Sequence, residues 1–138
     1  MSGAPRPVRA VLARAGYRTE VAVGPFTLLA DEPADRGGSD TGPTPHQLVA
    51  AGLASCTAMT LRMYAERHAL PLEGVEVAVE ERRPTDATRG PIAFDIRVRL
   101  DGPLDEAARA SLLSVAARCP VHRTLGTGAE LTLELEER

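Results

Sequence analysis

The sequence predicts an α+β fold in which three short strands come first, a long buried helix follows, and two strands, a second helix and a final strand complete the chain. Three observations lead to this prediction. Short β-rich runs near the N-terminus are separated by glycine and proline, residues 48–61 form an uncharged stretch of helical length, and two later stretches alternate apolar with polar side chains. The chain has 138 residues and no internal repeat or linker, so residues 1–138 are expected to form a single domain.

The N-terminal strands are predicted to form a meander, since Gly16 and Gly24-Pro25 favour turns between them. The three strands cover residues 8–12, 17–23 and 26–30. A loop rich in Gly, Pro and Asp follows over residues 31–44. The spacing of its glycines matches no phosphate-binding fingerprint, so they are interpreted as turn residues.

The central helix is predicted to begin at Thr44-Pro45, a capping residue followed by proline in the first turn, and to end near His68. Residues 48–61 are apolar on every side of this helix, which predicts that it is buried on most sides. Many of these residues are small enough for a second helix to approach closely. Together with a core that contains few aromatic residues, this favours a homodimer.

The second half of the chain shows both kinds of periodicity. Alternating side chains predict two half-exposed strands over residues 75–79 and 92–100, joined by the polar loop 82–90. A second helix is predicted over residues 104–118, because apolar residues recur there at helical spacing. One further helical turn is expected after Cys119, and residues 131–135 are expected to close the domain as a last strand.

The composition excludes several functions. A net charge of −3 and a pI near 5.6 argue against binding to nucleic acid or to an acidic membrane surface. All 16 basic residues are arginine, so a Schiff-base lysine and a phosphate-binding lysine are excluded. The N-terminal sequence lacks the apolar segment of a secretory signal, and the apolar run at residues 48–61 is shorter than the roughly 18–20 residues that span a bilayer. A cytoplasmic protein without a membrane segment is therefore expected, and a permanent structural disulfide is unusual in that compartment.

The two cysteines, Cys56 and Cys119, are the candidate nucleophiles. Cys56 lies within the apolar helix, and a lone cysteine in that setting is usually a small core residue. Cys119 stands between Arg118 and Pro120 at a helix junction, where unpaired N–H groups and positive charge lower the pKa of a thiol. Residue chemistry alone therefore makes Cys119 the more reactive thiol, with His122 close behind it in the chain.

Two other kinds of site stay open on the residues alone. His46 and His122 could join the two cysteines as zinc ligands, although no CxxC or HxxxH pair fixes a chelate. A Cys–His hydrolase would need one of these histidines to meet Cys56, and no oxyanion loop is recognisable.

The sequence resembles the OsmC/Ohr family of thiol-dependent peroxidases in three strings, LLADEP, GGSDTGPTPHQLVAAGLASCTAMTLRMYAERHALPLEGVEV and AARCPVHRTL. The CPVHRTL ending is similar to that of its OsmC-like branch. The resemblance covers roughly residues 17–136, and both cysteine contexts agree with it together. It implies α+β subunits that intertwine as a homodimer, with the active sites at the subunit interface.

The resemblance also implies a two-cysteine mechanism that needs no bound cofactor or metal. Cys56 would be the peroxidatic thiolate, which attacks an organic hydroperoxide and becomes a sulfenic acid. Cys119 would resolve that acid as a disulfide, which a dithiol such as lipoamide, or another thiol, would then reduce. This assignment reverses the order of reactivity that the residue chemistry gives.

The sequence departs from the family at the carboxylate that polarises the reactive thiol. The family glutamate stands ten residues before the first cysteine, or one position later in the OsmC-like branch, and these positions hold His46 and Gln47. The family arginine corresponds to Arg14, with Arg18 as the competing choice. On a straight helix His46 lies roughly 15 Å from Cys56, so it takes part only if two antiparallel subunits share the site.

Two functions follow as hypotheses. The first is a cytoplasmic, homodimeric thiol peroxidase for organic hydroperoxides. The second is a redox-sensing or binding protein that keeps the cysteine pair but has little peroxidase turnover, which the missing glutamate favours.

Overall fold

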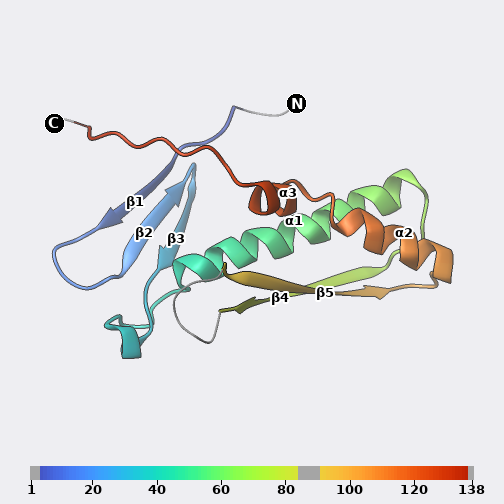
Figure 1. Cartoon of the computed structure of the whole chain (residues 1–138), viewed down its shortest axis with the longest axis horizontal. Coiled ribbons are helices and arrows are strands. Elements are labelled where there is room, and N and C mark those ends of the chain that lie inside the picture. The colour runs from blue at the N-terminus through green and yellow to red at the C-terminus, as the bar shows by residue number, and fades with distance from the viewer. Residues whose placement is uncertain (1–3, 84–90, 137–138) are drawn as a thin grey trace. The chain divides into compact units, whose positions relative to one another are not determined.

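The N-terminal strands form the antiparallel meander that the sequence predicts (Figure 1). The computed structural model describes residues 4–83 and 91–136, which divide into two compact units between Val49 and Ala50. The first unit holds the strands β1 (Val8–Leu12), β2 (Thr19–Val23) and β3 (Phe26–Ala30), paired in that order. Gly24 has a φ of +55°, which glycine adopts without strain, and it lets the chain reverse between β2 and β3.

The loop after β3 is held by one buried carboxylate, Asp31, which is 2% exposed. At distances of 2.6–3.3 Å it accepts hydrogen bonds from the Thr41 hydroxyl and from the backbone N–H groups of Glu32, Ser39 and Thr41. The short 3₁₀ helix η1 (Ala34–Arg36) lies within this loop. A Cβ at Gly38 would collide with the Glu32 carbonyl, which supports the interpretation of the loop glycines as turn residues.

The second unit contains most of the long helix α1 (Pro45–Arg67), whose ends agree with the predicted ones. The antiparallel strands β4 (Gly74–Arg82) and β5 (Ala93–Asp101) run alongside this helix (Figure 1). The helices α2 (Glu106–Ala116) and α3 (Pro120–Thr127) complete the unit. Most of the loop predicted between the two strands falls on residues 84–90 and lies outside the described residues.

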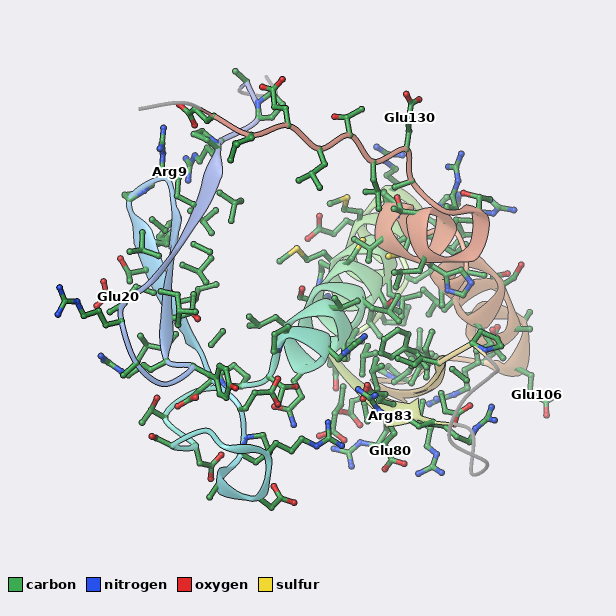
Figure 2. All side chains as sticks on the ribbon, turned by 60° about the vertical axis from the view of Figure 1, so that its left-hand side comes forward. Arg9, Glu20, Glu80, Arg83, Glu106 and Glu130 are labelled. Atoms are coloured by element: carbon green, nitrogen blue, oxygen red, sulfur yellow. The ribbon has the colours of Figure 1, made fainter. Side chains whose placement is uncertain are left out.

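The core of the second unit is a cluster of aliphatic side chains, each at most 9% exposed. It joins α1 to α2 and to the segments that lead into β4 and α2; its members are Leu61, Ala65, Leu72, Leu104, Leu112 and Ala116. Asp105 caps α2 by accepting the Ala108 N–H at 2.8 Å, and Glu106 in the first turn projects away from the core (Figure 2). Apolar packing and helix capping thus fix α2 against α1.

The expectation of a last strand over residues 131–135 is wrong for the single chain. The segment after α3 has no strand in the described residues, and Glu130 near its start points outward (Figure 2). Leu131, Leu133 and Leu135 are 88%, 101% and 92% exposed. Their alternation with polar residues is typical of a strand, but a strand also needs a neighbouring edge to receive its hydrogen bonds.

The expectation that α1 is buried on most sides is also wrong for the single chain. One stripe of the helix is buried, consisting of Leu53, Thr57, Leu61 and Ala65. Met59 and Met63, on another side, are 61% and 56% exposed. Among the described residues α1 is the one helix long and apolar enough to cross a bilayer, a property that core helices of water-soluble proteins share.

Candidate functional site

Cys56 and Cys119 meet inside the second unit, although they are far apart in the sequence. Cys56 is half-buried on α1, and Cys119 is fully buried directly before α3. Both are free thiols, and a hydrogen bond joins their side chains. The structure therefore brings together two reduced thiols that lie far apart in the sequence.

The local sequence explains where the Cys119 sulfur lies. Pro120 occupies the first turn of α3, where its missing N–H leaves no helical hydrogen bond unmade. Cys119 is therefore the N-cap of α3, and its sulfur accepts the backbone N–H of His122 at 3.4 Å. The sulfur thus stands where a serine or aspartate oxygen caps most helices.

Hydrogen bonds make Cys119 the more acidic of the two thiols. Burial by itself disfavours the charged form, but the hydrogen bonds outweigh burial and lower the pKa of Cys119 below its usual value. The groups that lower it are the Cys56 thiol, the backbone N–H groups of His122 and Val121, and the nearby Thr57 hydroxyl. Arg118, to which the sequence points as a cause, is exposed to solvent.

Cys56 is shifted in the opposite direction. Burial raises the pKa of the Cys56 thiol, and its hydrogen bond to Cys119 raises it further. The Val121 N–H and the Thr60 hydroxyl oppose this change but are outweighed. Within the pair, Cys119 is therefore the more acidic thiol and Cys56 the less acidic one.

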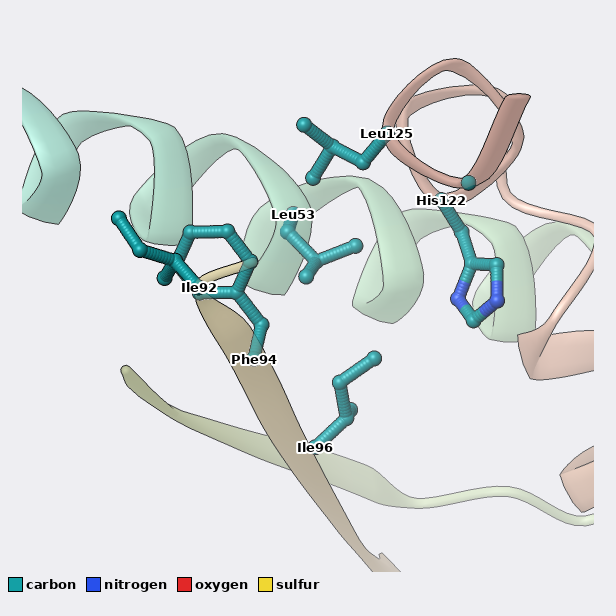
Figure 3. Close-up of a pocket in the computed structure, with 7 residues that line it drawn as sticks. Leu53, Ile92, Phe94, Ile96, His122 and Leu125 are labelled. Atoms are coloured by element: carbon teal, nitrogen blue, oxygen red, sulfur yellow. The ribbon is translucent and has the colours of Figure 1, made fainter. Parts of the chain in front are cut away.

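A small apolar pocket of about 200 Å³ lies between α1, β5 and α3. Figure 3 shows its walls, which come from Leu53 on α1, Phe94 and Ile96 on β5, and Leu125 on α3, with the ring of His122 also facing it. A second pocket of about 170 Å³ shares Ile96 and His122 with the first and is lined by Thr57 as well. Apolar walls with a single polar ring suit the organic part of a small molecule.

Of the other predicted site residues, His122 lies on α3 in the second unit, and the remaining four belong to the first unit. Arg14 and Arg18 lie in the connection between β1 and β2, and both are exposed. His46 is exposed in the first turn of α1. Gln47 makes a reciprocal cap with Thr44: the Thr44 N–H donates to Gln47 Oε1 at 2.9 Å, and the Gln47 N–H donates to Thr44 Oγ1 at 3.2 Å. The Gln47 side chain is therefore engaged in starting the helix.

Sequence reasoning missed the two threonines that contact the sulfurs. Thr57 contacts Cys119 and Thr60 contacts Cys56, both from α1. The available signal was the string CTAMT, in which two hydroxyl groups follow Cys56 within an otherwise apolar stretch. Within residues 4–83 and 91–136, no three His, Cys, Asp or Glu side chains are grouped closely enough to hold a metal ion, so the zinc hypothesis gains no support there.

Comparisons with known proteins agree on the fold. An OsmC-like protein from Mycoplasma pneumoniae is 22% identical, with 91% of this chain and 89% of that chain covered and a TM-score of 0.74. The organic hydroperoxide resistance protein OsmC from Legionella pneumophila is 24% identical, with 91% of each chain covered and a TM-score of 0.71. The organic hydroperoxide resistance protein OhrB of Bacillus subtilis is 23% identical, with 89% of this chain and 92% of that chain covered and a TM-score of 0.59. None of the curated proteins compared with the chain matches it.

The sequence of this chain matches a family model as well. The model is described as OsmC-like protein, and it matches residues 37–134, which include both cysteines and all of α1. The match extends over well more than half of the chain. It confirms the family that the sequence motifs indicate, and the chain belongs to the OsmC-like protein family.

Proposed function

We propose that this protein is a thiol-dependent peroxidase that reduces organic hydroperoxides through Cys56 and Cys119. The observation that carries the proposal is the interaction between the two reduced thiols, together with an apolar pocket lined by residues of α1 and α3. Family members such as the Legionella and Bacillus proteins are named for resistance to organic hydroperoxides, which supports the substrate class. Among the two sulfurs, Cys56 is the one with some exposure, so a peroxide reaches Cys56 first.

The proposed reaction begins with the shared proton. Cys56 passes its proton to Cys119 and attacks the distal oxygen of the hydroperoxide, so that an S–O bond forms and the O–O bond breaks. The alkoxide takes the proton from Cys119 and leaves as an alcohol, so that Cys56 is left as a sulfenic acid and Cys119 as a thiolate. The Cys119 thiolate then attacks the Cys56 sulfur, a disulfide forms, and hydroxide leaves as water. A dithiol such as lipoamide, or another thiol, returns the pair to its reduced state by exchange.

The test measures consumption of cumene hydroperoxide in the presence of dihydrolipoamide. Cys56→Ser is expected to abolish turnover, because Cys119, the other free thiol, is fully buried. In the absence of the dithiol, Cys119→Ser is expected to reduce one equivalent of peroxide and stop at a sulfenic acid, which a dimedone adduct reveals by mass. Ser55→Ala, which removes an exposed hydroxyl bonded to the Ala51 carbonyl, serves as the matched control. Undiminished turnover by Cys56→Ser would rule the mechanism out.

A second candidate is a redox-sensing or binding protein with little peroxidase turnover. The raised pKa of Cys56 favours it, because the attacking thiol then holds its proton at neutral pH. The absence of a carboxylate at His46 and Gln47 favours it too. This candidate predicts that one equivalent of hydroperoxide forms the disulfide while excess dithiol and peroxide give negligible further consumption. Rapid multiple turnover excludes it.

The proposal includes a single-domain subunit in an intertwined homodimer, in the cytoplasm, with no bound cofactor and no membrane or nucleic-acid partner. The exposed apolar side chains of the first unit support the dimer, among them Val8, Val11 and Phe26 at 60–66% exposure. The exposed methionines of α1 and the three exposed leucines after α3 support it as well. In such a dimer, Arg14 or Arg18 and His46 of one subunit would complete the site around Cys56 of the other.

A further inference from the structure

Thr57 is a buried polar residue that the two-cysteine mechanism leaves without a task. It is 1% exposed on α1, one residue after Cys56, and its hydroxyl donates to the Leu53 carbonyl at 2.8 Å. The same hydroxyl contacts the Cys119 sulfur. One hydroxyl carries one proton, so it donates to the carbonyl or to the sulfur but not to both.

The two possible acceptors differ in what they lose when the hydroxyl turns away. The Leu53 carbonyl accepts the helical N–H of residue 57 in any case, so losing the hydroxyl leaves it satisfied. The Cys119 sulfur is fully buried and has no water to solvate it when it carries negative charge. A bond to a charged acceptor is also about twice as strong as one between neutral groups.

We propose that Thr57 is a positioning residue for Cys119, whose hydroxyl turns from the Leu53 carbonyl to the Cys119 sulfur when that sulfur becomes a thiolate. Thr57 then completes a set of donors around the charge, with the His122 N–H at 3.4 Å, the Val121 N–H and the Cys56 thiol. The inference rests on the proposed function for its purpose, which is to keep the attacking thiolate ready for the Cys56 sulfenic acid.

The surroundings of Cys119 make Thr57 a decisive donor. From α1 the titratable group in contact with Cys119 is the Cys56 thiol, and from its own helix the His122 ring lies in the pocket that Thr57 also lines. The remaining walls of that pocket, from α2 and β5, are the apolar residues Ile96, Val98, Leu113, Ala116 and Ala117. Oxidation of Cys56 replaces its thiol proton with that of a sulfenic acid, whose oxygen departs as the disulfide forms, so Thr57 is the side-chain donor of this set that stays in place while the disulfide closes.

Thr57 assists the step in which the disulfide closes. The Cys119 thiolate forms a bond to the Cys56 sulfur, the S–O bond of the sulfenic acid breaks, and the hydroxide takes a proton to leave as water. The organic hydroperoxide is the oxidant that made the sulfenic acid. Thr57 keeps its proton throughout and releases the sulfur once the negative charge is gone, when its hydroxyl returns to Leu53.

The first experiment is a titration of thiolate absorbance at 240 nm in the reduced protein, which does not depend on peroxidase activity. Thr57→Val keeps the size of the side chain and removes the donor, so the lower midpoint is expected to rise by about one pH unit, a tenfold loss of thiolate below that midpoint. Thr57→Ser restores the donor and is expected to restore the midpoint. Ser55→Ala removes a hydroxyl from the same helix and is expected to change nothing.

The second experiment follows disulfide closure by stopped flow after one equivalent of cumene hydroperoxide. A tenfold loss of thiolate is partly offset because a more basic thiolate is a better nucleophile, so Thr57→Val is expected to close about threefold more slowly at neutral pH. At pH values above both midpoints the loss of thiolate disappears, and Thr57→Val is then expected to close about threefold faster than the parent. Melting curves identify a variant that fails to fold, and Thr57→Ala then replaces Thr57→Val.

An unchanged lower midpoint in a folded Thr57→Val overturns the inference and leaves the peroxidase proposal standing. A raised midpoint in a protein without peroxide turnover supports the role of Thr57 and contradicts the peroxidase instead. Failure of Thr57→Ser to restore the midpoint also overturns the inference, because the loss would then come from packing.

Discussion

Asp31 and Cys119 show how a single buried side chain can organise its neighbourhood by accepting backbone N–H groups. The Asp31 carboxylate holds the loop after β3 through Glu32, Ser39 and Thr41. The Cys119 sulfur holds the start of α3 through His122 and Val121. In both cases the donors favour the charged form of the acceptor, so the structural role and the acidity have one cause.

Asp31 is predicted to stabilise the fold in a pH-dependent way. Hydrogen bonds, first of all from the Thr41 hydroxyl, lower the pKa of Asp31 from 3.8 to about 2 in the folded chain. The contribution to stability is therefore complete above about pH 4, and it is lost as the pH falls through the folded pKa. Asp31→Asn is expected to lower the melting temperature at pH 7 and to flatten its fall between pH 4 and pH 2.

Melting curves followed by circular dichroism from pH 2 to pH 7 check this prediction. Asp35→Asn is the control, because Asp35 is an exposed carboxylate in the same loop. If the parent and Asp31→Asn lose stability with the same slope below pH 4, Asp31 does not hold the loop as its charged form.

At the scale of elements, Thr44 and Gln47 determine where α1 begins. The two side chains cap each other's N–H groups, and Pro45 supplies the first helical residue. This pair gives Gln47 a structural task at the position where the OsmC-like branch often holds a glutamate.

Capping variants test this structural task. Thr44→Ala is expected to cost about 1 kcal/mol of unfolding free energy, because it removes the hydroxyl that accepts the Gln47 N–H. Gln47→Glu keeps the acceptor for the Thr44 N–H and adds a negative charge at the helix N-terminus, so it is expected to gain about 0.3–1 kcal/mol. Urea denaturation measures both. Peroxide consumption is expected to stay unchanged in Gln47→Glu, and a faster reaction would show that position 47 reaches the thiols.

The sequence was sufficient for most elements because their signals are local. Glycine and proline mark the hairpin turns, alternation marks β4 and β5, and Thr44-Pro45 marks the start of α1. Both cysteines were recognised, but their contact depends on how α2 returns Cys119 to α1, which no local pattern specifies. The sequence did not point to Thr57 for the same reason. A threonine in an apolar helix can donate to a sulfur only when a cysteine that is distant in the sequence packs against it.

At the scale of the whole molecule, two apolar features of the sequence pattern stay exposed to solvent in the single chain. Residues 131–135 alternate as a strand does but are fully exposed, and α1 buries only one of its apolar sides. The expected strand was wrong because strand pairing is a property of two segments, and no described segment of this chain pairs with it. A second subunit would supply both the missing edge and the missing cover.

The dimer is predicted to depend on Leu133. In an isolated chain this side chain is 101% exposed, so Leu133→Glu should then change stability very little. In the proposed homodimer the leucine face is buried, and the same change is expected to shift the protein towards monomer in light scattering and to lower its melting temperature. Thr132→Glu, on the opposite face of the alternation, is the control and is expected to leave the dimer intact. A parent protein that remains monomeric at micromolar concentration contradicts the prediction.

The cap of α3 carries one more consequence. A thiolate is a charged acceptor at a helix N-terminus, whereas a sulfur bound in a disulfide is neutral and accepts a hydrogen bond only weakly. When Cys119 joins Cys56, α3 loses the strongest acceptor of its first turn at the moment the chemistry is complete. The amide hydrogen of His122 is then expected to exchange with solvent more readily, so the exchange rate at the start of the helix that begins at Pro120 reports the oxidation state of the protein.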